Sequence, residues 1–164
     1  MRTLLIVWWS VTGAARAIAQ AAAAAAAAAE PGINVRMIRC DEANADDLCA
    51  ADAMLIVCPE MLGSAAGMMK DFFDRTYYPA LGRLSGQPYA LIVSAGSDGE
   101  GAVRQIERIA SGWRLRAVAP ARIVCTYAQT PEAILAFKRL PESALEGARE
   151  LGATLASGLA LGLW

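Results

Sequence analysis

The sequence predicts an α/β fold in which a five-stranded parallel sheet is doubly wound, with helices on both faces. Extended apolar segments alternate with helical stretches along the chain, which is the pattern of a parallel sheet with helical crossovers. Several of the extended segments are solid hydrophobic runs, as expected for strands covered on both faces. With 164 residues, 56% of them hydrophobic, the chain is long enough for one core and too short for two ordinary domains. We therefore expect residues 1–164 to form a single domain.

Five segments are predicted as strands, and their polarity indicates their order. The first, third and fourth are uniformly apolar, whereas the second alternates polar and apolar residues and the fifth is mixed. Because edge strands admit polar residues, the first, third and fourth strands are predicted to be central, which gives the order 2-1-3-4-5. Ligands of such sheets bind at the carboxyl ends of the strands where the winding reverses, here between strands 1 and 3. The predicted strands are 4–9, 34–39, 53–58, 89–95 and 122–127.

Five helices are predicted between and after these strands. The first begins at Ala14 and contains nine consecutive alanines, Ala21 to Ala29. Alanine has the highest helix propensity, and its small side chain permits close packing on a sheet. The helix is predicted to end before Pro31 and Gly32. The predicted helices are 14–29, 45–51, 65–76, 101–113 and 141–161.

The turn from the first strand into the first helix has the composition of an anion site. The first N–H groups of a helix have no intrahelical acceptor and carry the positive end of its dipole. Ser10 and Thr12 add hydroxyl donors, and Gly13 allows close approach of a ligand. A simple helix cap would use the same residues, so this motif alone leaves both interpretations open. The absence of a G-x-x-x-x-G-K-[ST] loop, and of G-x-G-x-x-G after this strand, argues against NTP hydrolysis and Rossmann-type dinucleotide binding.

Two further loops are predicted at the same edge of the sheet. The third strand is followed by a loop at residues 59–64, and the fourth by a loop at residues 95–99. Their glycines permit tight turns or close approach to a ligand, and either loop alone suits an ordinary turn. The carboxyl ends of parallel strands meet at one edge, so the three loops together predict a shared binding site.

Composition excludes several kinds of chemistry. The chain has no histidine, and its four cysteines form no C-x-x-C pair, so we expect no zinc site and no histidine-based triad. The net charge of -1 gives no indication of the positively charged surface that nucleic-acid-binding proteins usually have. No segment has the roughly 18 to 20 uninterrupted apolar residues of a membrane span. Unpaired cysteines are typical of a reducing cytoplasm, so we expect a cytoplasmic protein without nucleic-acid or membrane partners.

With these three loops, the sequence resembles the flavodoxin-like FMN proteins over nearly its whole length. The family's phosphate loop, S/T-x-T-G-x-T, is similar to residues 10–15, and the P-E-Y-N-G-S loop of NAD(P)H-dependent FMN reductases is similar to residues 59–64. Residues 68–75 are similar to the helix that follows this loop. The sequence departs from the family at three positions, where Ala15 replaces threonine, Met61 tyrosine and Leu62 asparagine. The resemblance implies the flavodoxin-like fold with FMN as cofactor.

The resemblance assigns cofactor contacts to all three loops. It implies that the first loop holds the FMN phosphate and that the other two flank the isoalloxazine ring, chiefly through backbone groups. The implied phosphate-site residues are Ser10, Thr12, Gly13, Ala14, Ala15 and Arg16, the last either adding charge or remaining solvated. The implied ring-site residues are Pro59, Glu60, Met61, Leu62, Gly63, Ser64, Ala95, Gly96, Ser97, Asp98 and Gly99. No catalytic side chain is expected, because the flavin N5 carries the chemistry.

The activity that the resemblance implies is transfer of electrons from NADPH or NADH, through FMN, to a quinone or similar small acceptor. The alternative is a flavodoxin-type electron carrier without NAD(P)H activity; such carriers usually present an acidic face, whereas this chain is nearly neutral. A phosphorylated receiver module shares the strand order, but its acidic positions are occupied here by Trp8, Trp9 and Cys58. Reductases similar to this chain are commonly homodimers or homotetramers, and we expect one of these states.

Overall fold

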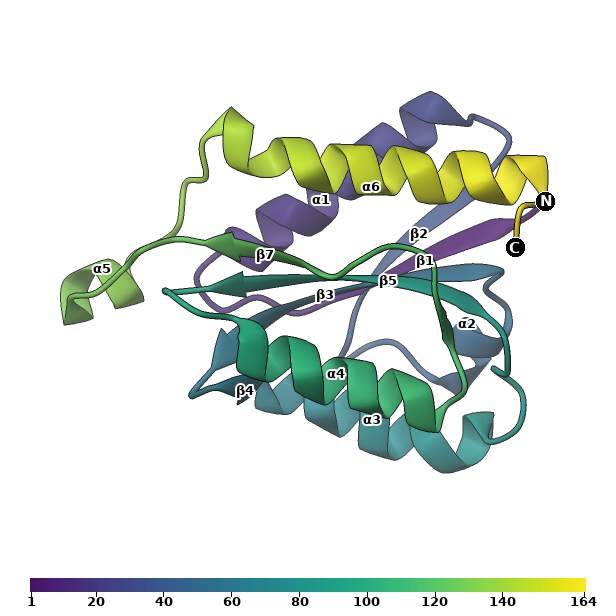
Figure 1. Cartoon of the computed structure of the whole chain (residues 1–164), viewed down its shortest axis with the longest axis horizontal. Coiled ribbons are helices and arrows are strands. Elements are labelled where there is room, and N and C mark those ends of the chain that lie inside the picture. The colour runs from purple at the N-terminus through teal and green to yellow at the C-terminus, as the bar shows by residue number, and fades with distance from the viewer.

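The computed structural model describes all 164 residues and contains a central parallel sheet with helices on both faces (Figure 1). The sheet has the order β2-β1-β3-β5, and β6 and β7 both pair with the outer side of β5. The strands are β1 (Thr3–Trp8), β2 (Asn34–Arg39), β3 (Ala53–Met61), β4 (Ser64–Ala65), β5 (Pro88–Ala95), β6 (Arg116–Ala117) and β7 (Arg122–Cys125). The helices are α1 (Ala14–Ala29), α2 (Ala45–Cys49), α3 (Gly67–Ala80), α4 (Glu100–Gly112), α5 (Pro131–Leu135) and α6 (Glu142–Leu161).

The structure confirms the predicted fold class and refines its last strand. β6 and β7 together occupy the place expected for the fifth strand, separated by a segment that contains Pro120. Proline has no N–H group to donate to the ladder, which explains why the pairing with β5 is interrupted there. Three elements were not predicted. β4 pairs antiparallel with the end of β3, β6 precedes the predicted fifth strand, and α5 is a five-residue helix after β7.

The side chains of each central strand alternate between two separate cores. Leu4 and Ile6 face the core under α1 and α6, whereas Leu5 and Val7 face the core under α2, α3 and α4. This alternation follows from the pleat of the strand, and burial on both faces explains the solid hydrophobic runs in the sequence. In Figure 1, α1 and α6 cover one face of the sheet and α3 and α4 cover the other.

The polyalanine helix α1 packs unusually closely against α6. Gly152 of α6 lies against the backbone of Ala22, where an added Cβ would be 2.8 Å from the Ala22 carbonyl carbon. Small residues on both helices therefore permit contact between main chains. This packing fixes α1 on the sheet and, with it, the position of its N-terminus.

The carboxyl ends of β1, β3, β5 and β7 open at the same edge of the sheet, since all four strands are parallel. The chain termini lie at the opposite end of the molecule, while α5 projects beyond β7 at this edge (Figure 1). None of the helices combines the length and hydrophobicity needed to cross a membrane. The edge that carries the four loops is therefore the place where the predicted site residues meet.

Candidate functional site

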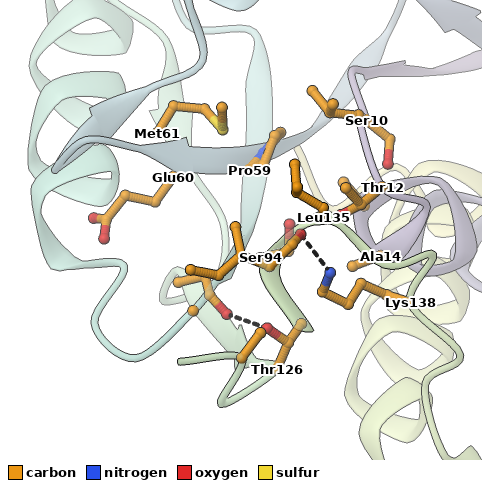
Figure 2. A pocket seen from close by; sticks show the side chains of 16 residues that line it. Ser10, Thr12, Ala14, Pro59, Glu60, Met61, Ser94, Thr126, Leu135 and Lys138 are labelled. Carbon is orange, nitrogen blue, oxygen red and sulfur yellow. Dashed lines mark hydrogen bonds between the residues drawn. The ribbon is translucent and has the colours of Figure 1, made fainter. Parts of the chain in front are cut away.

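A pocket of about 210 Å³ lies at the carboxyl edge of the sheet (Figure 2). Its walls come from the carboxyl ends of β3 and β5 and from the segments that follow β1, β5 and β7, so it lies where the winding of the sheet reverses. Open α/β sheets bind their ligands at this position. The lining residues are Ser10, Val11, Thr12, Ala14, Ala15, Pro59, Glu60, Met61, Ser94, Ala95, Gly96, Thr126, Ala128, Ile134, Leu135 and Lys138.

One end of the pocket is formed by the N-terminus of α1. Gly13 begins this helix with a left-handed backbone (φ 98°), and its N–H donates to the Ser10 hydroxyl oxygen at 3.1 Å. The N–H groups of Ala14 and Ala15 donate to no acceptor in the protein, although the two residues are only 6% and 1% exposed. Buried backbone donors are nearly always paired, and the helix dipole adds positive potential at this position. The loop is therefore shaped to receive an anion.

The segment predicted as the loop at residues 59–64 is the hairpin formed by the end of β3 and β4, and it is held against α4. The Glu60 carboxylate accepts hydrogen bonds from the N–H groups of Gly99 (3.0 Å) and Ala102 (3.2 Å) at the start of that helix. A carboxylate satisfies the free donors of a helix N-terminus and is favoured by its dipole. At Gly101 a Cβ would lie 2.8 Å from the Gly63 carbonyl carbon, so the two loops touch through their main chains. Glu60, Gly63 and Gly99 thus join two walls of the site.

The other end of the pocket is mainly apolar. Pro59 and Ala95 form its floor at the ends of β3 and β5, while Met61 is exposed beside them. The Thr126 hydroxyl donates to the Ala95 carbonyl oxygen at 3.3 Å, which ties the loop after β7 to this wall. Ile134 and Leu135 approach from α5. A flat, largely apolar ring with polar edges suits this end of the pocket.

Nine of the residues predicted from the sequence line the pocket. They are Ser10, Thr12, Ala14, Ala15, Pro59, Glu60, Met61, Ala95 and Gly96. Eight predicted residues lie outside the lining: Gly13, Arg16, Leu62, Gly63, Ser64, Ser97, Asp98 and Gly99. Arg16 is exposed to solvent, and the Phe137 ring lies over Gly13. Trp9 is also outside the lining; it packs on the core with the Arg39 guanidinium 5.3 Å from its ring centre.

Seven lining residues were absent from the sequence prediction: Val11, Ser94, Thr126, Ala128, Ile134, Leu135 and Lys138. Most belong to the segment after β7, which carries no recognisable motif. Its presence follows from topology, because β7 runs parallel to β5 and ends at the same edge. The order of the strands was therefore the one signal that pointed to a fourth loop.

The buried thiols beside the site are unreactive at neutral pH. Burial raises the pKa of the Cys58 thiol, which directly precedes Pro59, to about 12. Burial, with a contribution from the Asp41 carboxylate, also raises the pKa of Cys40 to about 12. Both thiols stay protonated at neutral pH, and only the thiolate is a good nucleophile. The protein side of the site therefore offers binding groups and no activated cysteine.

The fold and the site together define a flavodoxin-like protein. A flavodoxin from the domain Archaea has a TM-score of 0.77 at 18% identity, with 96% of this chain and 99% of that one covered. Two-electron reduced Megasphaera elsdenii flavodoxin has a TM-score of 0.73 at 25% identity, with 94% and 98% covered. A flavodoxin, WrbA-like protein from Agrobacterium tumefaciens has a TM-score of 0.72 at 18% identity, with 96% of each chain covered.

The family model described as NADPH-dependent FMN reductase matches residues 5–129, so the chain belongs to this family. No curated protein sequence matches the chain. The resemblance noted from the three loops is confirmed, and the protein is an FMN-binding, flavodoxin-like protein of the oxidoreductase class. The unpartnered amides of Ala14 and Ala15 fit a phosphate group, and the apolar end of the pocket fits a flavin ring.

Replacing Thr12 with alanine is expected to weaken FMN binding by about tenfold to a hundredfold. The substitution removes a hydroxyl that lines the phosphate end of the pocket, and a hydrogen bond to a charged group contributes about 1.5–3 kcal/mol. Quenching of flavin fluorescence on titration measures the dissociation constant. Thr12→Ser, which keeps the hydroxyl, is the control and should bind nearly as well as the original protein. An unchanged constant for Thr12→Ala would place the phosphate elsewhere.

Proposed function

We propose that the protein is an FMN-dependent oxidoreductase that takes electrons from NADPH or NADH and passes them to a quinone or similar small acceptor. The observation that carries this proposal is the pocket, which combines unpartnered amides at one end with an apolar, solvent-reaching wall at the other. Membership of the NADPH-dependent FMN reductase family supports a nicotinamide as the electron donor.

The residues of the chain would bind and orient the cofactor. Ser10, Thr12 and the amides of Ala14 and Ala15 would hold the phosphate, while Pro59, Met61 and the Ala95–Gly96 segment would flank the ring. Bound FMN supplies hydride acceptance at N5 and release of electrons to the acceptor. The chain need not provide an acid or a base for this chemistry, which suits a sequence without histidine. Donor and acceptor would use the same open side of the pocket in turn, which predicts ping-pong kinetics.

The direct test measures oxidation of NADPH and of NADH by the FMN-loaded protein with a benzoquinone as acceptor. We expect turnover with at least one donor, and parallel double-reciprocal lines as both substrates are varied. The same concentration of free FMN is the control for reaction of the unbound cofactor. If the loaded protein binds FMN but oxidises neither nicotinamide faster than free FMN does, the proposed reductase activity is refuted.

A flavodoxin-type electron carrier is the second candidate. It is supported by the flavodoxins among the similar structures, of which the Megasphaera elsdenii protein reaches 25% identity. The net charge of -1 does not indicate the strongly acidic surface that steers redox partners, so the charge gives this candidate little support. A loaded protein that accepts electrons from a chemical reductant, passes them to a redox protein, and leaves NADPH and NADH untouched would establish this candidate.

The proposal includes a homodimer or homotetramer as the working unit. Apolar side chains are exposed around the pocket, at the end of β3, on α5 and in the adjoining turns, namely Met61, Leu62, Tyr127 and Leu135. A second copy of the chain would cover such residues and narrow the entrance for a nicotinamide or quinone.

A further inference from the structure

Lys138 lies at the phosphate end of the pocket, far along the chain from the phosphate loop. Its backbone N–H donates to the Thr12 carbonyl oxygen at 2.7 Å, and its side chain lines the pocket with Thr12 and Ala14. Figure 2 shows Lys138 next to these two residues, whereas Met61 and Glu60 lie at the opposite end. The segment after α5 therefore brings a cation to the place where an anion is expected.

Lys138 is the one cationic residue in the pocket lining, and no carboxylate neutralises it. It takes part in none of the ion pairs of the structure, whereas the other lysine of the chain, Lys70, pairs with Asp74 at 2.7 Å. The Lys138 ammonium donates to the carbonyl oxygens of Ile134 (2.8 Å) and Ala136 (2.6 Å). An ammonium has three N–H groups, so one remains for a further acceptor.

Arg16, which the sequence suggested as the charged residue of the phosphate site, does not take this place. It follows the loop directly, yet it is exposed and lies outside the pocket lining. The phosphate end is otherwise built from the neutral donors of Ser10, Thr12 and the helix amides. A doubly charged ligand group would therefore meet a single positive side chain, that of Lys138.

The segment that carries Lys138 is able to adjust to a ligand. None of the residues of α5 is buried, and Phe137 beyond it is 68% exposed although its ring lies over Gly13. Segments with few buried apolar contacts open at low free-energy cost. A small shift of α5 would admit the cofactor while the ammonium stays beside the first turn of α1.

We propose that Lys138 recognises the phosphate charge of FMN and makes the protein select FMN over riboflavin. The inference rests on the proposed flavin function, and it assigns to one residue after β7 the positive charge that adds to the neutral donors of the phosphate loop in this selection. The third N–H of the ammonium would donate a charge-assisted hydrogen bond to a phosphate oxygen. Riboflavin has the same ring without the phosphate, so Lys138 would add nothing to its affinity.

The test compares FMN and riboflavin titrations of the cofactor-free full chain by fluorescence quenching, at low and at high salt. Lys138→Met should weaken FMN binding by about tenfold or more, since a hydrogen bond between charged groups contributes about 1.5–3 kcal/mol. The riboflavin constant should stay within about twofold, and the salt dependence of FMN binding should shrink. Lys138→Arg keeps the charge and should keep the selectivity. Lys70→Met, which removes the other lysine, is the matched control and should change neither constant.

Each remaining outcome contradicts a specific claim. Equal weakening of FMN and riboflavin by Lys138→Met would show that the lysine only holds α5 in place, and an unchanged FMN constant would show that it does not contact the phosphate. If Arg16→Met loses the preference for FMN over riboflavin and Lys138→Met keeps it, then Arg16, and not Lys138, recognises the phosphate charge. If the original protein binds neither flavin, the proposed function fails as well; if it binds FMN and Lys138→Met binds it equally well, only the present inference fails.

Discussion

Gly13→Ala is expected to weaken FMN binding more than a hundredfold. Gly13 has φ 98°, in the left-handed region that side-chain-bearing residues rarely adopt, and it begins α1 directly before the two free amides. We expect relief of this strain to rotate the peptide planes of Ala14 and Ala15 away from the pocket. Each lost hydrogen bond to a charged phosphate costs about 1.5–3 kcal/mol, so losing both exceeds a factor of a hundred.

Two further variants separate backbone strain from side-chain overlap. A Cβ on Gly13 would lie 2.9 Å from the Phe137 Cζ, but Phe137 is exposed and its ring can move aside. Gly13→Ala combined with Phe137→Ala should therefore fail to restore FMN binding. Gly82 has φ 77° in the turn after α3 with nothing near its Cβ position, so Gly82→Ala carries strain alone and should leave the FMN constant unchanged. Tight FMN binding by Gly13→Ala would refute the role given to the loop conformation.

Gly152→Ala is expected to lower the free energy of unfolding by about 2–3 kcal/mol. The added methyl group would lie 2.8 and 2.9 Å from the carbonyl carbon and Cα of Ala22, which are main-chain atoms that cannot rotate away. Inserting an atom into a closely packed core costs about 1–3 kcal/mol, and here the change also separates α1 from α6. For a chain of this length, the melting temperature should fall by about 4–12 °C.

The control for Gly152→Ala is a helical glycine whose Cβ position has no other atom nearby. Gly112 at the end of α4 has nothing within 4 Å of its Cβ position, so Gly112→Ala should keep the stability or raise it by up to about 1 kcal/mol. Thermal unfolding followed by circular dichroism compares the two variants. Equal stability of Gly152→Ala and the original protein would mean that α1 and α6 are farther apart than described.

The sequence predicted five of the seven strands, five of the six helices and three of the four loops, because these depend on local patterns. Solid apolar runs identified β1, β3 and β5 as central, and glycine and hydroxyl residues marked the loops that follow them. The helix bounds differ from the prediction by a few residues, since helix ends depend on packing as well as propensity. β6 was missed because only Arg116 and Ala117 pair with β5 before the chain reaches Pro120.

The parts of the site that were not predicted depend on contacts between distant segments. Lys138 reaches Thr12 only because β7 lies beside β5 and the chain after α5 runs back to the phosphate loop. Glu60 had the family pattern of a ring-flanking residue, but the structure shows its carboxylate also bound to the first amides of α4. The partners of a side chain in a neighbouring loop cannot be read from one segment of sequence.

A crystal structure of the chain grown with FMN tests the central claim most directly. The phosphate should lie within hydrogen-bond distance of the Ala14 and Ala15 amides and the Thr12 hydroxyl, with the ring between Met61 and Gly96. FMN bound with its phosphate away from the first turn of α1, or an empty pocket in crystals grown at saturating FMN, would contradict the account.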